Sequence, residues 1–254
     1  MATTHELRIV GGLVAKRYTS WGRGEHRREW ATLRRIHRDA AGLAPQPVHA
    51  ALAATPPTVT MTFVPGEPLA GRPSDPQLTT LATALHTLWT VGIDGGVDGW
   101  ADDLAFGNAL RDVDWPNPPR EVAAALAAAA RWWDGPDPDL LRERPSRLVL
   151  GHRDPNLANY LWDGRRIRIV DFEDARASDP ATEVALLAEH LSARDLDFDR
   201  LAALFEVDER RLRAARRLWA MFWLALLRPG GPASARNPAD SARRQADRLL
   251  DLLR

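Results

Sequence analysis

The sequence is most informative over residues 151–174, which open on Gly151-His152-Arg153-Asp154-Pro155-Asn156-Leu157-Ala158-Asn159 and close on Asp171-Phe172-Glu173-Asp174. Strand-forming residues lie at 148–150, 160–162 and 166–170, and Asp163-Gly164 is typical of a tight hairpin turn. The hairpin returns Asp171 to the side of Asn159, and the loop after the first strand carries Asp154 to the same end. We therefore expect three oxygen-bearing side chains at one sheet edge, an arrangement that suits a hard cation such as Mg²⁺.

This order of residues resembles the catalytic segment of protein kinases, His-Arg-Asp-x-x-x-x-Asn followed by Asp-Phe-Gly. It is closer still to the aminoglycoside phosphotransferase and choline kinase-like family. The residues that match are His152, Asp154, Asn159, Asp171, Phe172 and Asp174. The resemblance implies an α+β fold with two protein-kinase-like lobes. Residues 1–66 would form a truncated N-terminal β-sheet lobe that binds the nucleotide, and residues 67–254 a mostly helical C-terminal lobe with the acceptor site.

The same resemblance implies a role for each polar residue of the stretch. Asp154 would be the base that faces the acceptor hydroxyl, while Asn159 and Asp171 would hold Mg²⁺ on the nucleotide phosphates. Glu173 and Asp174 would either orient a basic acceptor or order the loop after Asp171. The alternative without chemistry is a hairpin that carries polar residues at its ends.

Lysine usage gives a second signal, because Lys16 is the only lysine among the 34 basic residues. Arginine and lysine are not interchangeable, so a single lysine is a candidate for chemistry that arginine does not perform. With the period of a strand, Val14, Lys16 and Tyr18 share one face. Val14-Ala15-Lys16 resembles the kinase strand whose lysine binds the nucleotide phosphates. Chance survival of one lysine codon is the alternative.

The segment Glu25–Asp39 is predicted to be a helix in which Glu29, Leu33 and Ile36 share one stripe. A carboxylate at the end of an apolar stripe can turn inward, so Glu29 is the expected partner of Lys16, as the corresponding glutamate is in kinases. Glu25, one turn earlier, is the weaker candidate. A solvated glutamate on the helix surface remains the alternative.

Two further strands are predicted at residues 48–52 and 58–64. By the resemblance, the end of the second is the hinge that contacts the nucleotide base, so Met61, Phe63 and Val64 would line that wall, together with Val14. The nucleotide cofactor would be ATP or GTP, bound with Mg²⁺.

Bulk properties exclude several classes of protein. The formal net charge is zero, which gives no electrostatic footprint for nucleic acid. The chain has no cysteine, so disulfides, thiolate catalysis and cysteine zinc sites are excluded. Residues 1–20 show no signal-peptide core, and the longest apolar run, residues 218–227, is too short to span a bilayer. We expect a cytoplasmic protein with no membrane partner; the sequence leaves the oligomeric state open.

The rest of the chain is predicted to be helical. Leucines repeat at helical spacing over residues 78–88, and further helices are expected at residues 101–111, 120–133, 180–190, 196–205, 208–227 and 238–254. Most of the ten tryptophans should be core, and one or two could line an acceptor pocket.

These signals together predict a kinase that moves the γ-phosphate of ATP or GTP to a hydroxyl of a small molecule, possibly an antibiotic. One alternative is a nucleotide-binding pseudokinase used as a regulatory module. Another is a choline or ethanolamine kinase, which would need an aromatic box around a quaternary amine.

One departure from the family generates a testable expectation. The family places two strands and a phosphate-covering loop before the lysine strand, whereas only fifteen residues precede Lys16. The backbone N–H groups that would cover the phosphates are therefore not visible in the sequence, and we expect weak nucleotide binding or a phosphate site open to solvent in the free protein. Calorimetric titration with ATP and GTP measures this affinity, and a sub-micromolar dissociation constant would contradict the expectation.

Overall fold

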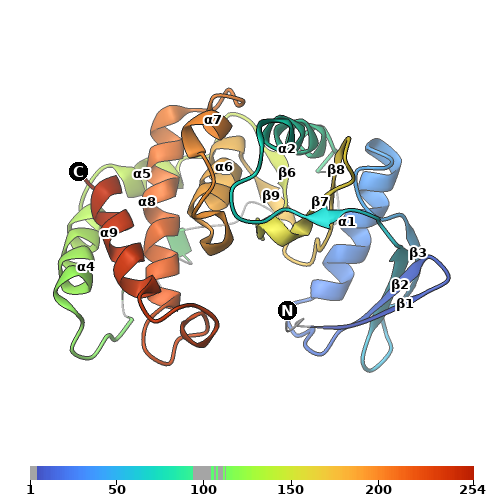
Figure 1. Cartoon of the computed structure of the whole chain (residues 1–254), viewed down its shortest axis with the longest axis horizontal. Helices are drawn as coiled ribbons and strands as arrows, with labels where there is room; N and C mark the ends of the chain where they lie inside the picture. Colours follow the sequence, from blue (N-terminus) through green and yellow to red (C-terminus); the bar gives the residue numbers. More distant parts are fainter. Residues whose placement is uncertain (1–4, 94–103, 106, 108–110, 112) are drawn as a thin grey trace.

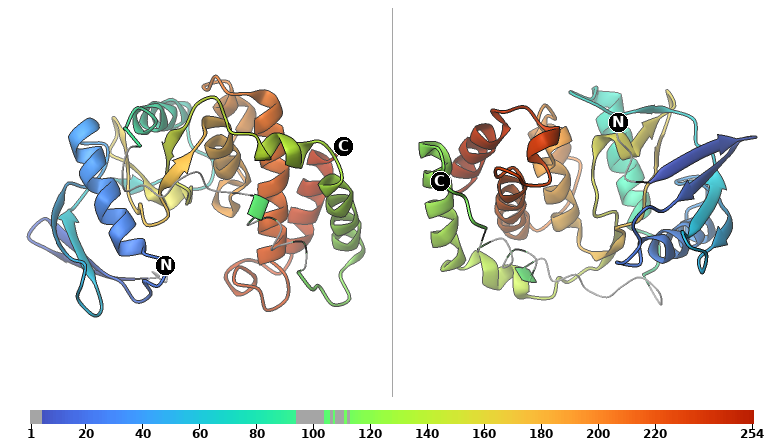
Figure 2. Two further views of the ribbon diagram at one scale, coloured as in Figure 1. Left: turned by 180° about the vertical axis from the view of Figure 1, so that it is seen from behind. Right: turned by 90° about the horizontal axis from the view of Figure 1, so that it is seen from below.

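The computed structural model describes residues 5–93, 104–105, 107, 111 and 113–254. The chain has a two-lobed α+β fold in which a small antiparallel sheet and one helix form the N-terminal lobe, and helices dominate the rest (Figure 1). The two ends of the chain lie on opposite lobes, and the views from behind and below show the same separation (Figure 2). The predicted boundary between residues 66 and 67 stays a prediction.

The N-terminal sheet has the strand order β1-β2-β4-β3, with all neighbours antiparallel. Its strands are β1 (Glu6–Val10), β2 (Leu13–Arg17), β3 (Pro47–Ala51) and β4 (Thr58–Thr62). Gly11 and Gly12 both have positive φ, which is the backbone conformation of a tight hairpin turn. From residue 5 onward, β1 is the only strand before the lysine strand, as the sequence predicts.

Register sets the side chains of β2 on defined faces. Lys16 lies opposite Leu7 and Val59, and Val14 lies opposite Ile9. Opposite residues of antiparallel strands point to the same side, so these five side chains share one face of the sheet. Helix α1 (Glu25–Asp39) has the bounds that the sequence predicts and buries Glu29, Leu33 and Ile36 in one stripe.

The C-terminal lobe combines short strands with helices. Its strands are β5 (Glu67–Pro68), β6 (Val149–Gly151), β7 (Tyr160–Trp162), β8 (Ile167–Ile169) and β9 (Arg176–Ser178). Its α-helices are α2 (Asp75–Leu88), α4 (Arg120–Trp133), α5 (Asp137–Arg142), α6 (Pro180–Glu189), α7 (Phe198–Ala202), α8 (Glu209–Leu226) and α9 (Ser241–Leu252). Short 3₁₀ turns are η1 (Leu157–Asn159), η2 (Leu191–Ala193) and η3 (Ser234–Arg236). β7 pairs with β5 and β8, and β6 pairs with β9.

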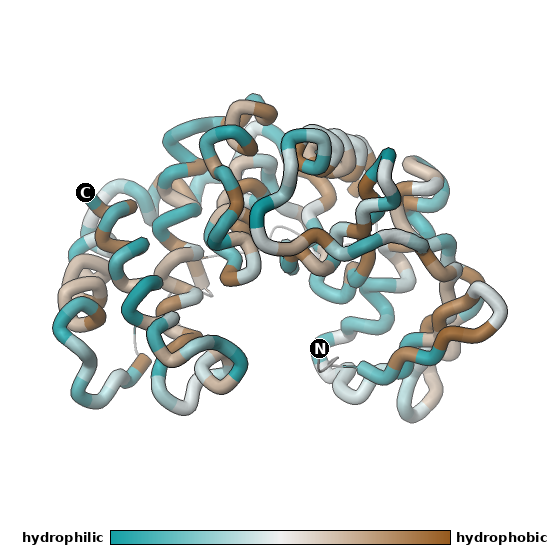
Figure 3. Tube along the Cα trace, viewed as in Figure 1, coloured by the Kyte–Doolittle hydropathy of each residue, from teal (hydrophilic) through white to brown (hydrophobic). Residues whose placement is uncertain are grey.

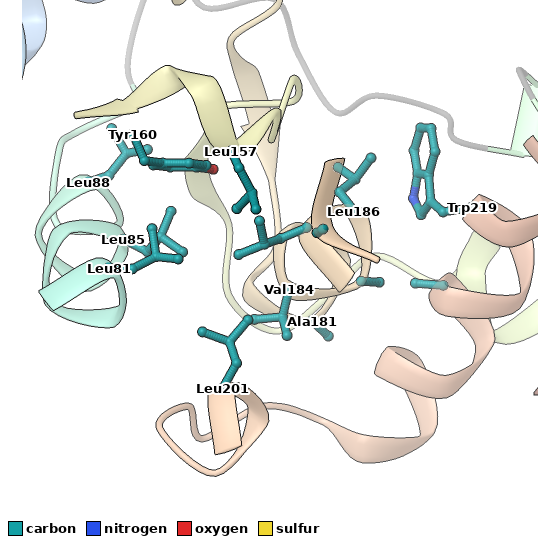
Figure 4. Packing of buried hydrophobic residues seen from close by; sticks show 14 of the residues in the cluster. Leu81, Leu85, Leu88, Leu157, Tyr160, Ala181, Val184, Leu186, Leu201 and Trp219 are labelled. Atoms are coloured by element: carbon teal, nitrogen blue, oxygen red, sulfur yellow. The ribbon is translucent and has the colours of Figure 1, made fainter. Parts of the chain in front are cut away.

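The core of this lobe lies between α2, the β7–β8 hairpin and α6. Figure 4 shows leucines of α2 packed toward Tyr160 and Leu157, with Val184 and Leu186 of α6 on the other side. These side chains are nearly all inaccessible to solvent, so the β7–β8 hairpin packs on a closely packed hydrophobic core. Figure 3 shows that apolar positions also run along the N-terminal strands.

Several predicted bounds were wrong. Helix α7 is shorter than residues 196–205 because the Asp197 side chain accepts from Arg200 N and starts the helix at Phe198. Helix α9 begins at Ser241, three residues after Pro238. The sequence reading missed α5, β5 and β9. Most of the helix predicted at residues 101–111 lies outside the described residues, as does Trp100. Among the described residues, no helix is long and apolar enough to cross a membrane.

Replacing Leu150 by alanine tests whether the packed core beneath the site stabilises the fold. Leu150 is fully buried on β6, which leads into the site, so the change should lower the free energy of unfolding by about 2–5 kcal/mol. Leu204→Ala is the matched control, because Leu204 is 36% exposed and the expected loss is about 0.5 kcal/mol or less. Urea titration of both variants measures the losses, and equal losses would contradict the assignment of Leu150 to the core.

Candidate active site

The loop at residues 151–159, called the Asp154 loop below, is held from beneath by Glu183 of α6. One carboxylate oxygen of Glu183 accepts from the backbone N of His152 at 2.9 Å and from that of Arg153 at 3.4 Å. A Cβ on Gly151 would lie 2.4 Å from the other oxygen, so only glycine allows this approach. These bonds tie α6 to the Asp154 loop.

His152 connects the Asp154 loop to the strand that leads to Asp171. The side chain is fully buried, its Nε2 donates to the carbonyl of Val170 at 2.8 Å, and its Nδ1 accepts from the backbone N of Asp154 at 3.3 Å. Both ring nitrogens are therefore used in holding the backbone, as expected for a structural residue.

Asp154 and Asn159 lie side by side at the end of the loop. The Asn159 amide donates to the Asp154 carbonyl at 3.0 Å and to Asp154 Oδ2 at 3.1 Å. The amide nitrogen of Asn159 thereby faces Asp154, which leaves its Oδ1 as the atom for a cation. Val170 N donates to the Asn159 carbonyl at 3.0 Å, so the two sides of the predicted site meet as the hairpin requires.

Lys16 is the centre of a buried ion cluster. Its Nζ lies 2.8 Å from Glu29, 2.5 Å from Asp171 and 2.8 Å from Glu173. Burial alone would lower the pKa of Lys16, but these three carboxylates outweigh it and raise the pKa well above its ordinary value. We call Lys16, Glu29, Asp171 and Glu173 the lysine cluster. One carboxylate oxygen from each of Glu29, Asp171 and Glu173 lies within 4.8 Å of the other two. A metal ion could bind these three oxygens at the place that the Lys16 ammonium occupies.

The sequence reading missed two residues beside the lysine cluster. Tyr18 donates its hydroxyl to the Glu29 carboxylate, and its position on the Lys16 face was the signal for it. His5 Nε2 lies 2.8 Å from Glu173, and His5 Nδ1 accepts from Thr19 N at 3.2 Å. Nothing in the local pattern of residues 5–10 indicates this long-range contact.

The loop at residues 171–174, called the Asp171 loop below, carries backbone strain. Asp171 has φ 68°, a left-handed conformation that costs free energy for a non-glycine residue. Phe172 is fully buried against the His152 ring and its N–H donates to Glu29 at 3.3 Å. With Phe172 fixed inward, the Asp171 side chain points outward and is 37% exposed.

Helix α1 also binds this loop from the N-terminal side. Arg28 donates to the Glu173 carbonyl at 2.6 Å, and Arg23 lies 3.4 Å from the Asp174 carboxylate. These contacts hold the Asp171 loop against α1. Binding of a basic acceptor by Glu173 and Asp174 stays a prediction.

Of the residues predicted to contact the nucleotide base, Val14 lies in β2 and Met61 in β4, whereas Phe63 and Val64 follow β4, which ends at Thr62 and not at residue 64 as predicted. Val14 is half-buried opposite Met61, Val64 is buried, and Phe63 is 47% exposed. The backbone N of Phe63 donates to the Gly12 carbonyl at 2.8 Å and is therefore used within the sheet. Backbone hydrogen bonds to a nucleotide base would have to come from the residues after Phe63. Leu7 and Ile9, which the sequence reading missed, are 52% and 59% exposed on the face that carries Lys16.

The oxygen donors fit a magnesium ion. An amide oxygen and a carboxylate are the ligand types that Mg²⁺ prefers alongside phosphates, and Asn159 and Asp171 supply them from neighbouring loops. The hydrogen bonds of the Asn159 amide nitrogen orient its oxygen, and the Asp171 carboxylate is partly exposed.

The Asp154 carboxyl stands in an environment that disfavours its charge. Partial burial raises its pKa above the ordinary 3.8, and the nearby carboxylates of Asp171 and Asp174 add to this. His152 and the hydrogen bond from Asn159 act in the opposite direction. A carboxylate with a raised pKa binds a proton more tightly, which suits a proton acceptor.

A model of the phosphotransferase enzyme family matches residues 11–220 of the chain. Among curated proteins, none matches the sequence.

Solved structures resemble the whole chain. A choline/ethanolamine kinase family protein from Mesorhizobium loti is 18% identical, with 99% of this chain and 85% of that chain covered and a TM-score of 0.67. The GDP complex of aminoglycoside 2'-phosphotransferase-IIIa is 20% identical, with 100% and 89% covered and a TM-score of 0.64. A thermostable mutant of aminoglycoside phosphotransferase APH(4)-Ia, in a ternary complex with ADP and hygromycin B, is 18% identical, with 98% and 92% covered and a TM-score of 0.62. At these identities the likeness shows the fold.

The raised pKa of Asp154 gives a pH-dependent prediction. The folded protein binds this proton more tightly than the unfolded chain, so ionisation of Asp154 lowers stability as the pH rises above about 3.8 and through the raised pKa. Asp154→Asn removes this loss of stability, because the amide does not ionise, and its oxygen can still accept the hydrogen bond from Asn159. We expect the variant to melt at a higher temperature than the parent at pH 7, with a smaller gain at pH 4.

Thermal unfolding at the two pH values measures the gain. Asp247→Asn, on an exposed position of α9, is the control and should change the melting temperature equally at both. A gain from Asp154→Asn that is independent of pH would contradict the electrostatic account.

Proposed function

Because the chain belongs to the phosphotransferase enzyme family and is a small-molecule kinase, we propose that it transfers the γ-phosphate of ATP or GTP to a hydroxyl group of a small molecule. One observation carries this proposal: Lys16, Asp154, Asn159 and Asp171, which come from both lobes and span 155 residues of sequence, lie around one site.

The nucleotide would bind between the N-terminal sheet and the Asp171 loop. Val14, Met61, Phe63 and Val64 would contact its base. Lys16 would exchange its bonds with Asp171 and Glu173 for bonds with phosphate oxygens and keep Glu29 as its partner. Asn159 and Asp171 would hold Mg²⁺, which supplies neutralisation of phosphate charge.

Asp154 would act on the acceptor. As the hydroxyl oxygen forms its bond to the γ-phosphorus, the bond from that phosphorus to the bridging oxygen breaks and the nucleoside diphosphate leaves. The hydroxyl proton passes to Asp154, whose raised pKa favours its uptake. Asn159 holds one oxygen of this carboxylate at 3.1 Å, so little reorganisation of Asp154 is needed.

Two classes of acceptor are proposed. The similar structures include an enzyme family named for choline and ethanolamine and an enzyme complexed with hygromycin B. An antibiotic is one proposed acceptor. A choline-like amine is favoured by the aromatic side chains of α8, where the ring of Phe222 lies 5.2 Å from that of Trp219 and 5.1 Å from that of Trp223.

Removing the base tests the proposed reaction. Asp154→Ala should lower turnover by roughly 10²–10⁴-fold, because general base catalysis contributes about this much. Mass spectrometry of reactions with ATP or GTP and a panel of hydroxylated metabolites and antibiotics identifies the phosphorylated product, and the rate is then measured on that acceptor.

Asp247→Ala, an exposed change on α9, is the control and should keep the parent rate. Nucleotide binding with no phosphorylated product from any acceptor would favour the regulatory pseudokinase instead. Equal turnover by Asp154→Ala and the parent protein would remove Asp154 from the role of base.

A further inference from the structure

A buried histidine lies beside the proposed base, and the reaction as described does not use it. His190 follows the last residue of α6, and its side chain is 10% exposed. Its Nε2 lies 3.9 Å from Asp154 Oδ1. The other oxygen of Asp154 is the one bound by Asn159, so His190 faces the oxygen that remains for a substrate.

The protein fixes which nitrogen of His190 carries the proton. The backbone N of Ser192 lies 3.1 Å from His190 Nδ1. Because a backbone N–H can only donate, Nδ1 must be the acceptor of this bond. The Ser192 hydroxyl, 2.7 Å from the same Nδ1, accepts from the backbone N of Leu157 at 2.9 Å and so has its own proton to give. Nδ1 is therefore an acceptor, and the neutral ring carries its proton on Nε2, toward Asp154.

The surroundings keep the ring neutral and in place. Burial lowers the pKa of His190 to about 4. The ring meets that of Trp223 edge to face, with 4.7 Å between centroids. Since η1, which contains Leu157, belongs to the Asp154 loop, the bond through Ser192 sets the ring and the base relative to each other.

The 3.9 Å separation is too long for a hydrogen bond, but one oxygen atom can lie at hydrogen-bonding distance from both groups. We propose that His190 binds the reacting oxygen of the acceptor, donating Nε2–H to it while Asp154 accepts its proton, and that this pair selects alcohols over amines. The inference rests on the proposed function.

Lone pairs explain the selection. A hydroxyl oxygen has two: one forms the bond to phosphorus and the other accepts from His190, while its proton goes to Asp154 and the nucleoside diphosphate leaves. A neutral amine has a single lone pair. If it accepts from His190 it has none with which to attack, so the donor opposes phosphorylation of nitrogen.

Water is the smallest molecule with the same two lone pairs and a proton, so hydrolysis of ATP or GTP without an added acceptor probes the site. His190→Leu should lower the rate constant of hydrolysis about 10- to 100-fold, because it removes the donor that orients the attacking oxygen. His190→Gln places an amide N–H near the position of Nε2, which can orient the same oxygen, and should restore the rate to within about fivefold of the parent. The KM for nucleotide should be unchanged in both.

His86→Leu is the matched control. His86 lies on α2, where its Nε2 is 3.1 Å from the carbonyl of Leu204, and its loss should leave hydrolysis unchanged. A rate for His190→Leu equal to that of the parent would overturn the inference. So would a loss in His190→Gln as large as in His190→Leu, because that result shows a packing role.

The tautomer is measurable in the parent protein and needs neither activity nor a variant that folds. Nitrogen-15 NMR of the histidine rings at pH 7 should show His190 neutral and protonated on Nε2. A ring protonated on Nδ1, or on both nitrogens, would overturn the inference. Absence of both hydrolysis and any phosphorylated product would instead count against the proposed function.

Discussion

The structure depends on one buried cation shared by three carboxylates. Lys16 on β2, Glu29 on α1, and Asp171 and Glu173 after β8 form a single cluster that joins the two lobes. Charges taken out of water are tolerated only when paired and hydrogen-bonded, and removing one member of such a pair costs about 3–5 kcal/mol. The lysine cluster therefore fixes the relative position of the N-terminal sheet and the Asp171 loop, and it does so with the groups that a nucleotide would use.

The two halves of the site differ in how much they must change on binding. On the acceptor side, Glu183, His152 and Asn159 hold the Asp154 loop through backbone and side-chain hydrogen bonds that need no substrate. On the side of the proposed nucleotide site, Lys16 already has three partners, so phosphate oxygens would have to displace Asp171 and Glu173 before they could bind it.

Local patterns in the sequence predict the helices and turns around the site but not its long-range contacts. Helix α1 and the hairpin after Asn159 follow from periodicity and turn residues, and the lone lysine and an inward carboxylate gave the pair of Lys16 with Glu29. His5 contacts the Glu173 side chain, and Arg28 donates to the Glu173 carbonyl. Both contacts join residues far apart in sequence, so no periodic pattern of residues predicts them. In the sequence, His190 is only the last position of the helix predicted at residues 180–190, because its proposed role depends on a hydrogen bond from the turn that follows it.

A crystal structure of the protein with Mg²⁺ and a non-hydrolysable analogue of ATP or GTP tests the central claim most directly. The account predicts that the Lys16 ammonium leaves Asp171 and Glu173 for a phosphate oxygen while it keeps Glu29. It also predicts that oxygens of Asn159 and Asp171 lie about 2.0–2.1 Å from the metal. A nucleotide bound elsewhere, with the lysine cluster intact, would contradict it.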